Sequence, residues 1–271
     1  MKLAGFLATH ERIVQVRISH VEGSSPREVG AWMCVSDTGS YGTIGGGQLE
    51  YMAQDRARQM LKDDAGHTQM DVPLGPDIGQ CCGGRVLLTL SKMDDAARHR
   101  ALAAEAQAER EAPEVLVFGA GHVGRALVRA MAPLPVRLRL VDSRAEELGL
   151  ADCMNKCLTP LPESMVSEAG PGAAFVIATH DHALDFLLAA AALDRGDAAY
   201  VGMIGSESKR AKFSNWARRH GGVDAGPLVC PMGRAGLGDK RPEVIAAFIA
   251  AEVLTALSRL AKVRLGTEAP A

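Results

Sequence analysis

The 271-residue sequence has no excess of charge of either sign, few cysteines and no long apolar run. Its 30 Lys and Arg and 32 Asp and Glu give a formal net charge of −2 at pH 7. Such a balance provides no overall attraction to nucleic acid or to an anionic membrane, so we expect neither as a partner. No window approaches the roughly eighteen apolar residues of a membrane span, and we therefore expect none.

Six cysteines in a chain of this length are too few for a disulfide scaffold. Cys81 and Cys82 are neighbours, and a bond between them would strain the backbone. The apolar stretch before His10 is short for a signal peptide, and no clear cleavage pattern follows it. These features predict free thiols and a cytoplasmic protein.

The first part of the chain, residues 1–92, is expected to form a small α+β domain. Alternating or compact apolar runs predict strands, and apolar residues at helical spacing predict a helix. The expected strands are 12–21, 31–35 and 85–90, and the expected helix is 48–61. An Ala-rich, charged segment, 93–113, is expected to be an exposed helical linker that ends at Pro113.

Residues 114–271 have a different pattern, in which continuous apolar runs alternate with helical segments. Continuous apolar runs are typical of strands that are buried on both faces. The expected strands are 114–121, 136–142, 173–179, 199–205 and 226–230, and the expected helices are 122–132, 181–194, 206–219 and 242–262. This alternation predicts a Rossmann-like, doubly wound parallel sheet in an α/β protein.

A G-x-G-x-x-G motif, Gly119 to Gly124 with Gly121 between them, lies between the first strand and first helix of this second part. Glycines at these positions let backbone N–H groups approach a pyrophosphate at the helix N-terminus. Asp142 ends the next strand, where an acidic residue would meet a ribose hydroxyl. His122 lies inside the motif, either as a ligand contact or as a polar residue at the mouth of the helix.

Three further segments of the second part are candidates for ligand contacts. His180 and Asp181 follow the fourth expected strand and are candidates for metal or proton binding, although a helix cap explains Asp181 equally simply. Ser206 begins a helix and either caps it or contacts an anion. Lys240 and Arg241 precede Pro242 at a helix N-terminus, where cations oppose the macrodipole unless an anion is bound.

The first part contains two glycine-rich loops, GSSPREVGA at 23–31 and GTIGGGQLE at 42–50. Gly45, Gly46 and Gly47 are expected to form a backbone nest for an anion, with turn formation as the alternative. Arg27 would supply positive charge, and Glu50 would complete the helix start.

The glycines around Cys81 and Cys82 leave the backbone of that loop bare, which favours an accessible thiol whose pKa local amides lower. Cys153 and Cys157 have no second Cys or His pair near them in sequence, which argues against zinc. We interpret these two, with Cys34 and Cys230, as small apolar residues, mostly buried.

Several of these segments, in this order, resemble the XdhC/CoxI family of accessory proteins for xanthine dehydrogenase and related molybdenum hydroxylases. The resemblance extends from roughly Arg12 to Leu260. It rests on GSSPREVGAWMCV, GTIGGGQLE, GQCCGG, VFGAGHVGRALV, THDHALD, VGMIGSESKRAKF and GDKRPEVIAAFIAAEVL.

The resemblance implies an N-terminal XdhC-type domain, a Rossmann-like domain, and binding of the molybdenum cofactor, a phosphate-bearing pterin. It implies that the cofactor is held during sulfuration by a cysteine desulfurase and then passed to the apo-enzyme. The family keeps a cysteine directly before Gly-Gly, which corresponds to Cys82 and places this thiol near molybdenum; Cys81 is an additional thiol. Arg241 departs from the pattern, because relatives often have a hydroxyl residue there.

Two functions follow from these observations. One is a molybdenum cofactor chaperone that does not itself catalyse a reaction and is expected to be a homodimer. Persulfide carriage by Cys81 or Cys82 is compatible with this function. The other is an NAD(P)-dependent oxidoreductase, with a nucleotide in the Rossmann crevice, Asp142 on the ribose and His180 as acid and base. The oxidoreductase leaves the Cys-Cys-Gly-Gly loop and the first domain without a role, so the sequence favours the chaperone.

Overall fold

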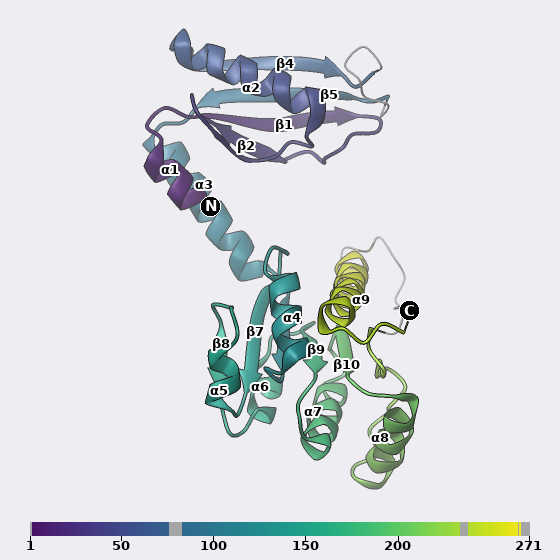
Figure 1. Ribbon diagram of the computed structural model, residues 1–271. Helices are drawn as coiled ribbons and strands as arrows, with labels where there is room; N and C mark the ends of the chain where they lie inside the picture. Colours follow the sequence, from purple (N-terminus) through teal and green to yellow (C-terminus); the bar gives the residue numbers. More distant parts are fainter. Residues whose placement is uncertain (1, 76–82, 234–237, 265, 267–271) are drawn as a thin grey trace. The chain divides into compact units, whose positions relative to one another are not determined.

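The computed structural model describes residues 2–75, 83–233, 238–264 and 266. The chain divides into two compact units, Met1–Ala108 and Glu109–Ala271 (Figure 1). The first unit contains α1 (Leu3–Thr9), β1 (Val14–Glu22), β2 (Trp32–Val35), β3 (Ser40–Gly42), α2 (Gly47–Lys62), β4 (His67–Pro73) and β5 (Arg85–Lys92). Helix α3 (Asp95–Glu111) begins in this unit and ends in the second.

The first unit is an antiparallel sheet with the strand order β3-β2-β1-β5-β4. Along β1, Val14, Val16 and Ile18 are buried while Gln15 and Arg17 are not, because successive side chains point to opposite faces. Helix α2 contributes its apolar stripe to the core on the Val14 side of the sheet. The stripe consists of Leu49, Ala53, Ala57, Met60 and Leu61.

Helices α1 and α3 lie side by side (Figure 1) and share a second, smaller core. Phe6 of α1 and Ala101 of α3 are buried in it, and Leu102 packs against it. The segment expected to be an exposed linker is therefore helical, but its first half buries a face against α1.

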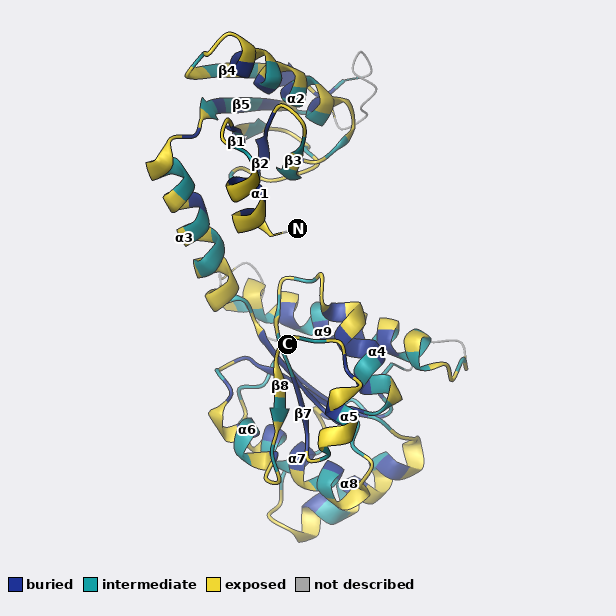
Figure 2. Ribbon diagram, turned by 60° about the vertical axis from the view of Figure 1, so that its left-hand side comes forward, coloured by how far each residue is buried: buried dark blue, intermediate teal, exposed yellow. Residues whose placement is uncertain are grey.

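The second unit is a parallel sheet with the strand order β10-β9-β6-β7-β8. Its strands are β6 (Glu114–Phe118), β7 (Arg137–Asp142), β8 (Lys156–Leu158), β9 (Ala174–Ile177) and β10 (Tyr200–Met203). Its helices are α4 (His122–Met131), α5 (Ala145–Gly149), α6 (Glu163–Glu168), α7 (His182–Asp194), α8 (Glu207–Arg219) and α9 (Pro242–Arg264). Every residue of β6, β9 and β10 is buried, which confirms the Rossmann-like fold expected from their continuous apolar sequences. In Figure 2, strands in the interior of this unit are dark blue, the colour of buried residues.

Separate apolar clusters cover the two faces of this sheet, one built with α4, α5 and α9 and the other with α6, α7 and α8. The chain leaves β6 in one direction through β7 and β8, and then crosses back to β9 on the other side of β6. The switch point therefore lies between the carboxyl ends of β6 and β9, the usual ligand position in such sheets.

Two expectations for this unit are wrong. Residues 226–230 form only a single bridge, between Gly202 and Val229, instead of a strand. Helix α9 is long and apolar enough to cross a membrane by length and composition, with a mean hydropathy of 1.8 over eighteen residues. The sequence was expected to contain no such segment. Its buried side, which includes Ile249, Val253 and Leu257, packs in the core with α4.

Candidate functional site

The turn from β6 into α4 is built around the predicted glycines. Gly119 has φ +107°, and a Cβ there would lie 2.2 Å from the carbonyl oxygen of Ala178, at the end of β9. A Cβ at Gly124 would lie 1.9 Å from the carbonyl oxygen of Gly119. These two glycines therefore allow backbone to approach backbone, first between the strands and then between helix and strand.

Gly121 differs from these two glycines. A Cβ at this position would meet none of the described atoms within 4 Å, so the space in front of it is open. Gly121 is the N-cap of α4, and among the described residues no side chain caps this helix. The first N–H groups of α4 and its positive dipole end therefore face an opening, while the His122 side chain is exposed beside it. This geometry suits a phosphate group.

Asp142 lies beside the same turn, but its carboxylate is already hydrogen-bonded. Oδ2 accepts from the backbone N of Ala120 at 2.7 Å, and Oδ1 accepts from the backbone N of Arg144 at 2.9 Å. The Arg144 guanidinium donates to both oxygens, at 3.0 and 2.9 Å. Burial alone would raise the pKa of Asp142, but these bonds outweigh it and hold the pKa below its usual value.

The predicted ribose contact of Asp142 stays a prediction, and these bonds weigh against it. A carboxylate that contacts a ribose must have acceptor capacity directed at the ligand, whereas both oxygens of Asp142 bind the chain itself. Asp142 thus supports the glycine turn together with Arg144, which was not among the predicted site residues. The signal for this pair in the sequence was an arginine two residues after the acidic residue.

The carboxyl end of β9 presents one exposed and one capping residue. Asp181 is the N-cap of α7 and accepts from the backbone N of Ala183 at 2.8 Å, as the capping alternative predicts. The side chain of His180 is exposed. Thr179, just before them, donates from Oγ1 to Oδ1 of Asp185 at 2.6 Å.

Asp185 also accepts a hydrogen bond from the Nζ of Lys209, which lies on α8. The side chains of Asp185 and Lys209 are 1% and 10% exposed, so this is a buried ion pair between α7 and α8. Ser206 caps α8 by accepting from the backbone N of Lys209 at 3.3 Å. An anion at Ser206 would therefore find Lys209, one turn into the same helix, already paired with Asp185.

Lys240 and Arg241 precede α9, as expected. The guanidinium of Arg241 pairs with Asp239, whose Oδ1 also accepts from the backbone N of Arg241 at 2.9 Å. Asp239 thus already supplies the negative charge that the helix start was expected to obtain from a ligand. Lys240 is exposed and has no hydrogen bond or ion pair to any described residue.

The start of α9 is attached to the far end of α4. Glu243, in the first turn of α9, forms an ion pair at 3.8 Å with Arg129, in the last turn of α4. Arg129 lies seven residues, or about 10 Å, along the helix from His122. The structure therefore does not bring Lys240 and Arg241 to the glycine turn through this helix pair.

In the first unit, the nest predicted at Gly45, Gly46 and Gly47 has an internal occupant. Oε2 of Glu50 accepts from the Thr43 hydroxyl at 2.6 Å and from the backbone N of Ile44 and Gly46 at 3.2 and 3.1 Å. Glu50 thus takes the position assigned to an anionic ligand, because it lies one turn into α2 and reaches back to the loop.

The paired thiols Cys81 and Cys82 lie outside the described residues, so their role stays a prediction. Cys34 and Cys230 are buried, whereas Cys153 and Cys157 are half-buried. Burial raises the pKa of Cys34 to about 12, against a smaller opposing effect of Arg98, and also raises the pKa of Cys153 and Cys230. Among the described residues, no cluster of three His, Cys, Asp or Glu side chains is arranged to hold a metal ion.

Comparison with known families covers both units. The family model described as the XdhC Rossmann domain matches residues 115–253, more than half of the chain. The model described as the XdhC and CoxI family matches residues 6–71. The chain belongs to the XdhC and CoxI family.

Two known proteins are similar to this XdhC-family chain over most of its length. The uncharacterized protein YqeB of Escherichia coli strain K12 is 26% identical over an alignment of 246 residues. The match covers 86% of this chain but only 41% of that protein. A crystal structure from Bacillus halodurans, described as a xanthine dehydrogenase, has a TM-score of 0.77 and 19% identity, with 95% of each chain covered. At this identity, the second similarity shows the shared fold.

Proposed function

We propose that this protein is an accessory protein that binds the molybdenum cofactor and passes it to apo xanthine dehydrogenase or a related molybdenum hydroxylase. Membership of the XdhC and CoxI family supports an accessory role for an enzyme of this type. Binding and insertion of the cofactor, its sulfuration by a cysteine desulfurase, a homodimeric state and a cytoplasmic location are parts of the proposal.

The observation that carries the proposal is the open glycine turn at the switch point of the parallel sheet. The cofactor has a phosphate on its pterin, and the N-terminus of α4 offers uncapped N–H groups in front of Gly121, where no side chain of the described residues fills the space. These residues fit a phosphate without any rearrangement of the turn. In the proposal, Gly119 and Gly124 shape the turn, and Gly121 and His122 line the phosphate position.

Carriage of the cofactor is favoured over NAD(P)-dependent hydride transfer by the bonds of Asp142. A dinucleotide would have to compete with Arg144 and the Ala120 amide for this carboxylate, whereas a pterin phosphate needs only the turn. The buried charges nearest the carboxyl end of β9, Asp185 and Lys209, neutralise each other. We therefore propose a carrier whose own residues bind and release the molybdenum cofactor, while its partner enzymes carry out the chemical steps.

Cys82 remains the proposed thiol near molybdenum and Cys81 an additional thiol, on the basis of the family motif. The experiment is anaerobic purification of the parent and of single variants, followed by molybdenum analysis and fluorescence of the oxidised pterin. Cys82→Ala is expected to lose most of the bound cofactor with an unchanged fold. Cys81→Ala should lose less, and Cys153→Ala and Cys157→Ala should match the parent. A parent protein without molybdenum and pterin, even after incubation with free cofactor, would refute the proposed function.

A further inference from the structure

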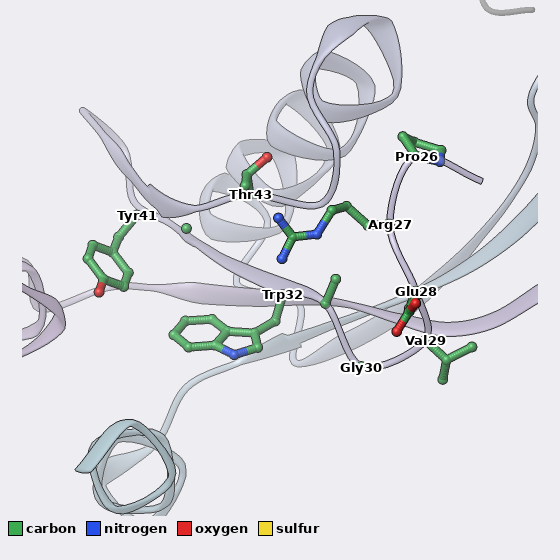
Figure 3. Close-up of a pocket in the computed structure, with 10 residues that line it drawn as sticks. Pro26, Arg27, Glu28, Val29, Gly30, Trp32, Tyr41 and Thr43 are labelled. Carbon is green, nitrogen blue, oxygen red and sulfur yellow. The ribbon is translucent and has the colours of Figure 1, made fainter. Parts of the chain in front are cut away.

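The first unit contains a pocket of about 710 Å³ (Figure 3). It is lined by residues 26–32 and 41–43. These segments belong to the two glycine-rich motifs at 23–31 and 42–50, except Trp32 and Tyr41, which lie directly beside them. The filled nest at Gly45 to Gly47 does not account for the first motif, so the pocket is the feature that the two motifs share.

The wall of the pocket is held in place by backbone bonds and close packing. Gly30 N donates to the carbonyl oxygen of Ile18, and Ile18 N donates to that of Ala31, both at 2.9 Å. These bonds tie the loop to β1. A Cβ at Gly45 would lie 2.7 Å from Cγ of Pro26, so the two loops interlock only because residue 45 is glycine. The pocket is therefore formed before any ligand arrives.

One cation in this pocket has no partner in the described part of the chain. The guanidinium of Arg27 points into the space between Thr43 and Trp32 (Figure 3), and it forms no ion pair there with a described carboxylate. In the same unit, Arg12 and Arg85 pair with aspartates at 3.7 and 2.6 Å. Glu28 also lines the pocket but forms no ion pair with Arg27, whose five donors are thus available to an anion.

Aromatic rings lie beside this cation. The rings of Trp32 and Tyr41 both line the pocket, with centroids 6.1 Å apart and planes tilted by 39°. The Tyr41 hydroxyl donates to Oε1 of Glu105 at 2.7 Å, which fixes its ring, and Trp32 packs against the core formed with α1 and α3. Rigid aromatic surface next to an unpaired guanidinium suits a flat ring that bears negative charge.

We propose that this pocket binds a planar heterocycle that carries an anionic group. The ring lies against Trp32, and the anion is held by the guanidinium fork of Arg27, which matches the geometry of a carboxylate or phosphate. The volume lies within the range of small-molecule sites, roughly 300–1,000 Å³. The ligand class follows from the pocket alone and does not depend on the molybdenum cofactor, whose phosphate the proposed function assigns to the glycine turn of the second unit.

The sequence provides a direct reporter, because Trp32 and Trp216 are its only two tryptophans. In the full-length Trp216→Phe variant, Trp32 alone reports tryptophan fluorescence. We expect 6-carboxypterin, a flat anionic ring, to quench it saturably. Uncharged pterin, which has only the ring, and inorganic phosphate, which has only the anion, should bind at least about tenfold more weakly. Fluorescence anisotropy of 6-carboxypterin with the parent protein checks the result without Trp216→Phe.

Arg27→Gln should weaken 6-carboxypterin binding about tenfold, and Arg27→Lys should restore part of it. Arg100→Gln is the control, because Arg100 is an exposed arginine of the same unit outside the pocket. Absence of saturable binding, or equal affinities for Arg27→Gln and the parent, would overturn the pocket assignment. Binding of 6-carboxypterin by a protein that never binds the cofactor would refute the proposed function alone.

Discussion

At the scale of single residues, the three glycines of the β6–α4 turn have different tasks. Gly124 has no room for a side chain, because a Cβ would lie 1.9 Å from a backbone oxygen, whereas Gly121 faces open space. Gly124→Ala should therefore lower the free energy of unfolding by about 1–3 kcal/mol. Gly121→Ala should change it by less than about 0.5 kcal/mol but weaken phosphate binding. Urea unfolding and cofactor titration of both variants test this; equal stability losses would contradict the division of roles.

The carboxylate of Asp142 gives a pH-dependent prediction. Its pKa in the folded protein is lowered, so its stabilisation is complete above the pKa of an unfolded aspartate, about 3.9, and is lost as the pH falls through the lower folded value. Asp142→Asn should cost about 1.5 kcal/mol or more at pH 7, and this difference should shrink below about pH 4.

Urea unfolding of the parent and of Asp142→Asn between pH 7 and pH 3 measures this difference. Asp152→Asn is the control, since Asp152 is exposed and has no hydrogen bond or ion pair in the described part of the chain. A difference that stays constant or grows toward pH 3 would show that the charge of Asp142 does not stabilise the turn.

The residues of the site show where sequence analysis succeeds and fails. The positions of Gly119 and Gly124 were predictable, because only glycine fits a close backbone approach. The partners of Asp142 and of the nest at Gly45 to Gly47 were not, since both are side chains that fold back onto their own loops. A motif indicates that a charged group binds at a position, but that group can be a side chain of the protein instead of a ligand. Glu50 is the anion at the nest, and Arg144 is the cation at Asp142.

At the scale of elements, strands buried on both faces were predictable and short edge strands were not. The strands β6, β9 and β10 appear in the sequence as continuous apolar runs. The edge strand β8 has three residues, and its Leu158 is 58% exposed, so it carries no such run. Helix α1 is seven residues long and depends on α3, a partner distant in sequence, to bury Phe6.

The ion pair between Asp185 and Lys209 is the principal polar link of α7 to α8. Lys209→Met would leave the buried carboxylate of Asp185 with Thr179 as its remaining side-chain donor. We expect a loss of about 3–5 kcal/mol in the free energy of unfolding. Lys212→Met, on an exposed position of the same helix, should change it by less than about 0.5 kcal/mol. Chemical denaturation of both variants measures these changes in the free energy of unfolding. A loss below about 1 kcal/mol for Lys209→Met would show that the ion pair contributes little to stability.

At the scale of the whole molecule, each of the four apolar clusters among the described residues lies within one unit. Two of them lie between Leu3 and Leu102, and the other two lie between Val115 and Leu257. Fragments 1–112 and 113–271, which keep α3 intact, should therefore each fold alone. Calorimetry should give one cooperative transition for each; absence of a transition in the second fragment would contradict the independence of its core.

The central claim is that the protein delivers the molybdenum cofactor to a partner enzyme. The most direct measurement is activation of an apo molybdenum hydroxylase by the loaded protein, compared with an equal amount of free cofactor, under anaerobic conditions and at limiting concentration. We predict faster and more complete activation by the loaded protein, with Cys82→Ala giving no advantage over free cofactor. Equal activation by loaded protein and free cofactor, or retention of the cofactor by the protein in the presence of the apo-enzyme, would contradict the account.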